Sequence, residues 1–344
     1  MNSRKKVGVA AGLAGGFFWG LDPHIFTFLF LMVPFVEGDT MFKLGIIGAA
    51  GMAAFFKEIF ALLMVSGYQA VKGDLIASFQ TLNSKEERKA WGWVAISAMV
   101  SGPIATTCYA ISVSMAGPAW PAMITAIYPV IASIGGAIFL KDKLTAKGWV
   151  GVGIIGVGML LLSFSNPQME ALPYLSLGLI IAAVTACSWG SEGVILSVGL
   201  RNSKLTSTQC VLIRNIFATL AWFLIMVPFV ARPDGFKFIL AVIQHPLTLF
   251  ITMIYALNML IDLVFYYKSI DMIGPGKAAG LNITYVIFAL IFGFVINLIY
   301  PSYGFTPPSW TFYVVGACII AGDILVLSKD ADAEDSSLLK LDEK

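Results

Sequence analysis

The sequence predicts an all-α membrane protein, and three observations lead to that fold class. Of the 344 residues, 58% are hydrophobic and only 12% are charged, so the chain is far more apolar than an ordinary globular domain. Apolar runs of roughly 20 residues, enough for a helix to cross a bilayer core about 30 Å thick, recur along the chain. Short motifs also repeat in the same order in the two halves of the chain.

Ten segments are apolar over lengths that suit a membrane-spanning helix. Their apolarity is unbroken, whereas the strands of a transmembrane barrel alternate in polarity over about 10 residues. We therefore expect ten transmembrane helices, over residues 7–36, 44–68, 91–113, 119–140, 148–165, 173–200, 206–230, 247–267, 273–299 and 308–327.

The basic residues predict which way the chain faces. In a ten-span arrangement, 17 of the 22 lysine and arginine residues fall on one side, three fall on the other and two lie inside spans. Loops rich in Lys and Arg stay in the cytoplasm. We therefore expect a multi-pass protein of the cytoplasmic membrane with both termini in the cytoplasm. The net charge of +2 gives no reason to expect a nucleic-acid partner.

The internal repeat is the strongest signal in the sequence. Trp19-Gly20 in the first span corresponds to Trp189-Gly190 in the sixth, and Lys57 in the second corresponds to Arg214 in the seventh. Several matches in the same order indicate an internal duplication. The offset of 157 residues between Lys57 and Arg214 persists without a gap into the fourth and ninth spans, where it relates Gly117-Pro118 to Gly274-Pro275 and Tyr128 to Tyr285.

The repeat predicts the organisation of the chain. Each half holds five spans, an odd number, so the two halves must cross the membrane in opposite directions. We expect a first five-helix repeat over 1–167, an inverted second repeat over 168–330, and a charged, disordered cytoplasmic tail over 331–344. Inverted repeats are a transporter design, in which two halves enclose a site near the midplane and expose it alternately to each face.

The same residues carry a resemblance to a known family. The Trp-Gly pair in the first span of each half and the basic residue in the second are two of its features. A third is a Pro-bearing fourth span that ends in Lys-Asp-Lys-Leu (141–144) before a Gly-rich fifth span. With these features the chain resembles the drug/metabolite transporter superfamily, EamA type, over residues 7–327. The resemblance implies ten helices in a five-plus-five inverted repeat around a central substrate pathway.

Carboxylates inside spans are the first candidates for function, because an unpaired charge in the membrane is costly and usually faces water or a partner. Asp22 and Glu192 occupy equivalent places in the two halves, and each precedes a residue that weakens a helix, Pro23 or Gly193. We expect a bend at both points and a coupling role for both carboxylates, with protons as a candidate coupling ion. The alternative is a structural role, in which the two carboxylates pair with the basic residues Lys57 and Arg214.

Two neighbouring ionisable residues have more local interpretations. Glu58 lies next to Lys57 on another face of the helix, and we expect it to be a partner of Lys57 rather than a substrate ligand. For His24 two interpretations stay open: a proton relay, or a core histidine whose ring nitrogens are satisfied by hydrogen bonds.

A substrate site is expected around the eighth span. Asn258, Asp262 and Tyr266 are spaced by four residues, which places them on one helix face. Small-molecule sites combine aromatic walls with a few placed polar groups. The further residues expected to line such a site are Tyr109, Trp120, Tyr128, Asn282 and Tyr285, with Lys277 near a span end as the alternative contact for an anionic ligand.

These observations predict a secondary transporter that moves a small polar or zwitterionic metabolite by alternating access. Acids and bases inside the spans nearly balance, so the sequence favours neither a cation nor an anion. It shows no ATP-binding loop, metal cluster or catalytic constellation, so we expect neither an enzyme nor a cofactor. Gly151-Val-Gly153-Ile-Ile-Gly156 lies inside an apolar span and indicates close helix contact rather than a dinucleotide site. The alternatives are a membrane-embedded enzyme for a lipid-linked substrate and a passive channel.

Overall fold

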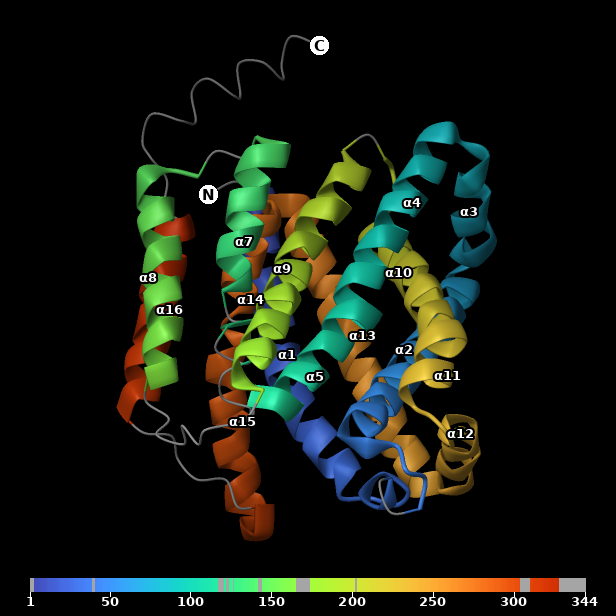
Figure 1. Ribbon diagram of the computed structural model, residues 1–344. Helices are drawn as coiled ribbons and strands as arrows, with labels where there is room; N and C mark the ends of the chain where they lie inside the picture. Colours follow the sequence, from blue (N-terminus) through green and yellow to red (C-terminus); the bar gives the residue numbers. More distant parts are fainter. Residues whose placement is uncertain are drawn as a thin grey trace.

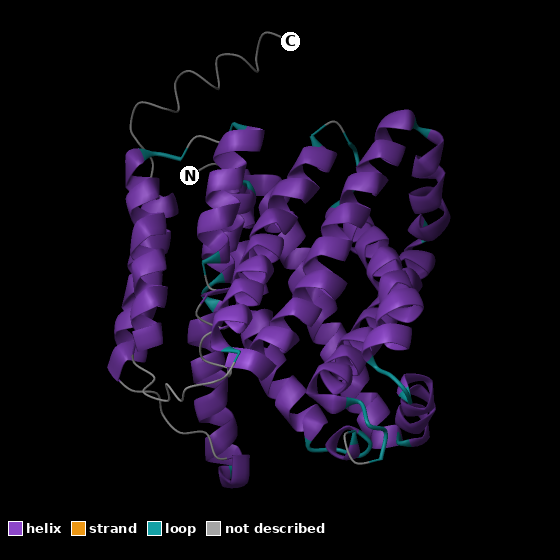
Figure 2. Cartoon of the chain, in the orientation of Figure 1, coloured by secondary structure: helices purple, strands orange, loops and turns teal. Residues whose placement is uncertain are grey.

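The computed structural model describes residues 3–38, 41–116, 121, 124–125, 127–141, 144–164, 174–201, 203–303 and 310–327. Within these ranges every regular element is a helix and no strand occurs (Figure 2). The long helices run between two ends of the molecule, and the described chain begins at the upper end in Figure 1. The predicted all-helical fold class is therefore confirmed for the described residues.

The α-helices follow the chain in the order shown in Figure 1. They are α1 (Ser3–Phe30), α2 (Gly45–Lys72), α3 (Asp74–Gln80), α4 (Lys85–Met99), α5 (Ala105–Ala116), α7 (Tyr128–Gly135), α8 (Ala146–Phe164), α9 (Leu175–Leu200), α10 (Ser207–Ala221), α11 (Val227–Val230), α12 (Gly235–Gln244), α13 (Pro246–Ile273), α14 (Pro275–Asn282), α15 (Tyr285–Ile299) and α16 (Trp310–Leu327). Three five-residue π-helical turns continue α4, α7 and α10, over Val100–Ile104, Gly136–Leu140 and Trp222–Met226.

Several helices have the length and apolarity that a membrane demands. A helix satisfies its backbone hydrogen bonds internally, which lipid cannot do for it. Helices also occupy part or all of each of the other four segments expected to span, as α1, α7, α8 and α16. The six described segments that are long and apolar enough to cross a bilayer are Ile47–Lys72, Lys85–Ser112, Leu175–Leu200, Ser207–Phe229, Pro246–Ile273 and Pro275–Ile299.

Glycines bring the central helices into close contact, as expected for small residues in lipid. On α1, a Cβ atom at Gly16 would lie 3.0 Å from the carbonyl oxygen of Asn282, and one at Gly20 would lie 2.9 Å from that of Tyr285. Gly151 on α8 likewise faces the backbone of Gly322 on α16. The glycine runs of the first and fifth spans are therefore packing surfaces.

The ninth expected span is broken near its middle. α14 ends at Asn282, Ile283 and Thr284 form a turn, and α15 begins at Tyr285. In the first half α7 begins at Tyr128, which is the residue 157 positions before Tyr285. A helix therefore begins at each of these two tyrosines, which the sequence pattern had placed at equivalent positions. Ile283 and Thr284 keep right-handed helical backbone angles, and their N–H groups donate to Ala279 and Leu281, so the break is a local change in helical winding.

Several local features can be compared with the sequence. α1 runs through Pro23 and α9 through Gly193 without interruption, so the expected bends do not break either helix, and Gly193 packs closely against Pro275. A short helix, α3, lies between the second and third expected spans. The sequence analysis missed α12, whose buried side carries Phe238 and Val242. The expected tail, residues 331–344, lies outside the described residues.

Candidate functional site

An aromatic cluster occupies the centre of the helix bundle, where the two halves of the chain meet. The Trp19 ring stacks on Tyr285, with centroids 4.7 Å apart, and lies 5.9 Å from Tyr128. It also meets Trp189 edge-on at 6.4 Å, and Trp189 in turn contacts Tyr109 at 5.5 Å. The structure therefore brings together three of the expected aromatic residues, and it adds both tryptophans of the repeated Trp-Gly motif.

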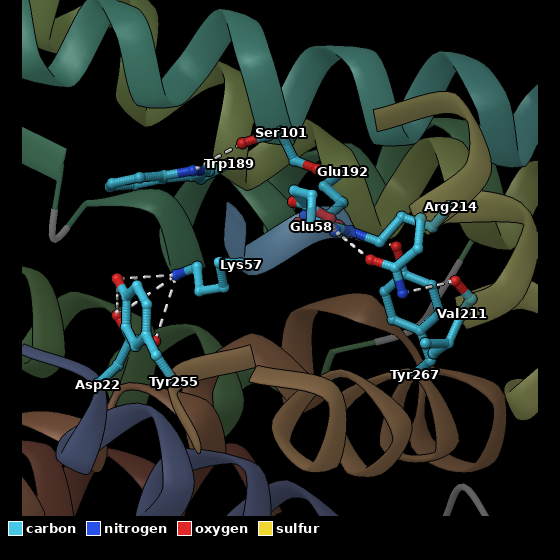
Figure 3. Close-up of polar contacts among 11 residues, drawn as sticks. Asp22, Lys57, Glu58, Ser101, Trp189, Glu192, Val211, Arg214, Tyr255 and Tyr267 are labelled. Atoms are coloured by element: carbon cyan, nitrogen blue, oxygen red, sulfur yellow. Dashed lines mark hydrogen bonds and ion pairs between the residues drawn. The ribbon is translucent and has the colours of Figure 1, made fainter. Parts of the chain in front are cut away.

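Asp22 belongs to a network with Lys57 and Tyr255, drawn at the left of Figure 3. The Lys57 Nζ atom lies 3.3 Å from Asp22 Oδ1 and donates to the Tyr255 hydroxyl at 3.1 Å. Tyr255 in turn donates to Asp22 Oδ2 at 3.1 Å. Both charged side chains are about one fifth exposed, at 18% and 19%. The pairing of Asp22 with Lys57, raised as the structural alternative, is present.

Arg214 pairs with Glu58 on α2, not with Glu192. The Arg214 Nη1 and Glu58 Oε2 atoms are 2.5 Å apart, and both side chains are at least 93% buried. Arg214 Nη1 also donates to the side-chain oxygen of Asn215. The expectation that Glu58 is the partner of Lys57 is therefore wrong. Adjacent residues of a helix point about 100° apart, so Lys57 and Glu58 meet charges on different helices.

Glu192 lies close to this pair but has a different partner (Figure 3). The Tyr267 hydroxyl donates to Glu192 Oε1 at 3.0 Å, and Glu192 is only 8% exposed. Among the described residues no basic side chain forms an ion pair with Glu192. It is a buried carboxylate held by a neutral hydroxyl, an arrangement that can accept a proton without breaking a salt bridge.

The three residues on the polar face of α13, Asn258, Asp262 and Tyr266, have different neighbours. Asn258 donates to the backbone oxygen of Phe18 on α1 at 2.9 Å. Asp262 faces Gly15 of α1, where a Cβ atom would lie 3.2 Å from Asp262 Oδ1. Tyr266 is buried against α9, and its hydroxyl would lie 3.6 Å from a Cβ atom at Gly193. Tyr266 therefore does not join the aromatic cluster, although the sequence grouped them.

Asp262 lies beside the break between α14 and α15. The side-chain amide nitrogen of Asn282, the last residue of α14, is also 3.2 Å from the place of a Gly15 Cβ atom. Asp262 Oδ1 and Asn282 Nδ2 are both buried without a hydrogen-bond partner among the described residues. The side-chain oxygen of Asn282 accepts from the Tyr128 hydroxyl at 3.2 Å. Asn282 thus lies near the unpaired carboxylate and is hydrogen-bonded to Tyr128 of the aromatic cluster.

The centre of the bundle carries more acids than bases. Its described carboxylates are Asp22, Glu58, Glu192 and Asp262, and its described basic side chains are Lys57 and Arg214. Each base is paired with one acid, so two carboxylates are left without a cation. The near balance inferred from the sequence was taken over whole spans and does not describe this centre, where the described acids outnumber the described bases.

The remaining candidates lie elsewhere. Both ring nitrogens of His24 have partners, with Nδ1 2.7 Å from the Tyr303 hydroxyl and Nε2 2.8 Å from the backbone oxygen of Ala289. This favours the core interpretation over the proton relay. Lys277 lines a cavity at the start of α14, at the end of the bundle where α1 begins. Trp120 lies outside the described residues.

Sequence reasoning missed four site residues. Trp19 and Trp189 were used as repeat markers, and the shared Trp-Gly motif could have suggested that the two rings meet. Tyr255 and Tyr267 hold the carboxylates Asp22 and Glu192. The sequence pointed to these two tyrosines only weakly, through their position on the same predicted helix as Asp262.

The comparisons with known proteins find a solved chain of similar fold but show no family. No family model matches the chain. Protein LicB of Haemophilus influenzae is 25% identical over 202 residues, which cover 59% of this chain and 66% of LicB. The match thus spans just under two thirds of LicB. A solved structure described only as a crystal structure of a protein superimposes with a TM-score of 0.59 at 14% identity, over 98% of this chain and 99% of that one.

Proposed function

We propose that the protein is a secondary transporter for a small polar metabolite that carries a compact cationic group, either an organic cation or a zwitterion. The observation that carries this proposal is the surplus carboxylate Asp262, which lies beside the break between α14 and α15. A cationic group would neutralise it. The aromatic cluster adds ring faces that attract a cation, by about 0.5–2 kcal/mol for each well-placed ring.

The proposal includes ten spans in two inverted repeats, and reciprocal contacts support it. A Cβ atom at Gly20 on α1 would meet the Tyr285 carbonyl oxygen and the Phe288 Cβ atom at 2.9 and 2.6 Å. A Cβ atom at Gly190 on α9 would meet the corresponding atoms of Tyr128 and Ile131 at 2.8 and 2.6 Å. Residues 128 and 131 precede 285 and 288 by 157 positions. The first helix of each half thus contacts the fourth helix of the other half through equivalent atoms.

The proposed location is the cytoplasmic membrane, with both termini in the cytoplasm. We expect a reporter fused at Lys344 to be active on the cytoplasmic side and one inserted within 300–308 to be active on the opposite side. The reason is the excess of basic residues on the side of the termini. Phosphatase and fluorescent reporters in the same two places measure this directly. Finding both positions on one side of the membrane would contradict the ten-span arrangement.

Protons are the proposed coupling ion, and Glu192 is the carboxylate best placed to carry one. We expect Glu192→Gln to keep the fold but to lose the dependence of uptake on the pH gradient, because glutamine has the same size and cannot titrate. Asp22→Asn is also expected to impair coupled uptake, and it leaves the Lys57 ammonium without its carboxylate. Uptake into proteoliposomes with and without a pH gradient measures both effects. Unchanged pH dependence in both variants would exclude these carboxylates as coupling groups.

The transport proposal itself is tested in two steps. A thermal-shift screen of the purified protein against organic cations, zwitterions and anions identifies a ligand, since binding to the folded state stabilises it by mass action. Counterflow in proteoliposomes then separates the classes. Preloaded ligand accelerates uptake through a carrier but not through a channel. Conversion of the ligand to a new compound, detected by mass spectrometry, would instead support a membrane-embedded enzyme.

A further inference from the structure

The short helix α12 has a place in the molecule that is set by the segments on either side of it. Its 10 residues extend over about 15 Å, too little to cross a bilayer core about 30 Å thick. Residues 230–234 separate it from the segment Ser207–Phe229, and only His245 separates it from Pro246–Ile273. Both segments are long and apolar enough to cross a bilayer, so α12 lies where they leave the membrane, at the lower end of Figure 1.

The exposed side of α12 has an apolar face next to a polar one. Phe236, Leu240 and Ile243 are 54%, 58% and 53% exposed, and their spacing of four and three residues places them on one face of the helix. Lys237 and Gln244 are exposed as well. Each directly follows a residue of the apolar face, so it points about 100° away from that residue. A helix that lies flat at a membrane surface has this pattern, with apolar side chains toward the acyl chains and polar ones toward water.

The third face of α12 fixes the helix to the connection between α1 and α2. Phe238 is fully buried, and the rings of Phe35 and Phe42 meet it edge-on, with centroids 5.0 and 5.1 Å away. Phe35 lies in the 3₁₀ turn Phe35–Glu37, and Phe42 lies shortly before α2. Residues two positions apart on a helix point about 200° apart, so the face with Phe236 points away from this contact.

The exposed apolar face of α12 is continuous with the exposed sides of the flanking segments. The Phe236 ring lies 6.0 Å from that of Phe223, which belongs to the segment Ser207–Phe229 and is itself 45% exposed. On the other side of α12, Leu247 in the first turn of α13 is 64% exposed. A lipid leaflet that covers the outer sides of these two segments therefore also covers the apolar face of α12.

We propose that α12 is an interfacial anchor and that its partner is the lipid leaflet at this end of the bundle. Phe236, Leu240 and Ile243 insert among the acyl chains to a depth of about 5–10 Å, while Lys237 and Gln244 face the headgroups and water. Because the opposite side of α12 packs on the connection between α1 and α2, the leaflet also holds that connection in place. This inference rests on the membrane location of the protein and not on transport.

Photocrosslinking of the full-length protein in phosphatidylcholine liposomes tests the lipid contact. The photoreactive amino acid p-benzoylphenylalanine replaces Leu240 in one variant and Gln244 in another, and on irradiation it bonds to C–H groups within reach. We expect the protein with the probe at 240 to gain the mass of one phospholipid, and the protein with the probe at 244 to form several-fold less of this adduct. Equal adduct formation at the two positions would overturn the proposal. A crosslinked pair of chains from position 240 would also overturn it, because a second copy would then cover this face.

Hydrogen exchange in lipid nanodiscs tests whether the leaflet holds the neighbouring connection. Leu240→Asp places a charge on the lipid-facing side, which lipid disfavours, so we expect faster amide exchange in α12 and in residues 31–38 and 41–44. Gln244→Asp adds the same charge on the water-facing side and should exchange like wild type. Unchanged exchange in Leu240→Asp, or equal increases in both variants, would overturn the proposal. The photocrosslinking result introduces no charge, so it stands even if Leu240→Asp does not fold.

Discussion

An Arg214→Met variant is expected to lower the free energy of unfolding by about 3–5 kcal/mol, the range for breaking a buried ion pair from one side. Arg214 and Glu58 are almost fully buried and lie 2.5 Å apart. Without the guanidinium, the Glu58 carboxylate stays in the bundle centre with no compensating charge. Unfolding of the purified protein in a mixed-micelle denaturant series measures the change.

Two companion variants separate this effect from loss of packing. Arg214→Met combined with Glu58→Gln removes both charges, so the double variant should recover much of the lost stability. Lys237→Met removes one partner of an exposed pair, since the Lys237 side chain is 78% exposed beside Asp234. That change should cost no more than about 1 kcal/mol. A double variant as unstable as Arg214→Met would show that packing, and not charge, explains the loss.

Asp262→Asn is expected to weaken binding of a cationic or zwitterionic ligand by about tenfold to a hundredfold. A hydrogen bond to a charged group contributes about 1.5–3 kcal/mol, and about 1.4 kcal/mol corresponds to a factor of ten. The substitution keeps the shape of the side chain and removes the surplus charge beside Asn282. Titration of wild type and variant with a ligand from the thermal-shift screen gives both dissociation constants.

The control is another aspartate on the same helix. Asp271 lies near the end of α13, where it is exposed and faces Arg4. Asp271→Asn should leave the affinity unchanged within about twofold, because a screened surface charge contributes little. Equal affinities for Asp262→Asn and wild type would move the cation site to the aromatic rings, and a preference for anionic ligands would contradict the proposed substrate class.

Hydropathy predicted the positions of the helices well, because a long apolar segment in lipid must satisfy its own backbone hydrogen bonds and therefore forms a helix. Each segment expected to span contains a described helix, although in the segment expected over 119–140 the long described helix, α7, begins only at Tyr128. The glycine contacts were also predictable, since spacing by four residues places Gly12, Gly16 and Gly20 on one side of α1. The break after Asn282 was harder to predict. Asn282 and Thr284 are residue types found at helix ends, but they also occur inside helices, and neither side chain caps α15: Thr284 Oγ1 donates to the Leu281 carbonyl oxygen, and Asn282 accepts from Tyr128.

Charge pairing was the least predictable part of the site. The sequence shows that Lys57 and Glu58 are adjacent, but which helix each side chain faces depends on the packing of the whole bundle. In the structure Lys57 forms an ion pair with Asp22, and Glu58 forms one with Arg214. As a result the carboxylates without a cation are Glu192 and Asp262, which a count of charges along the chain could not identify.

The reciprocal glycine contacts have a consequence for motion. Gly20 packs against α15, and Gly190 packs against α7. On the transport proposal, these two helix–helix contacts are equivalent and are oriented toward opposite faces of the membrane. A single hinge mechanism then serves both gates, and the bodies that move are composites of helices from the two halves. The energies of the inward-open and outward-open forms would differ only through the residues at which the two copies have diverged.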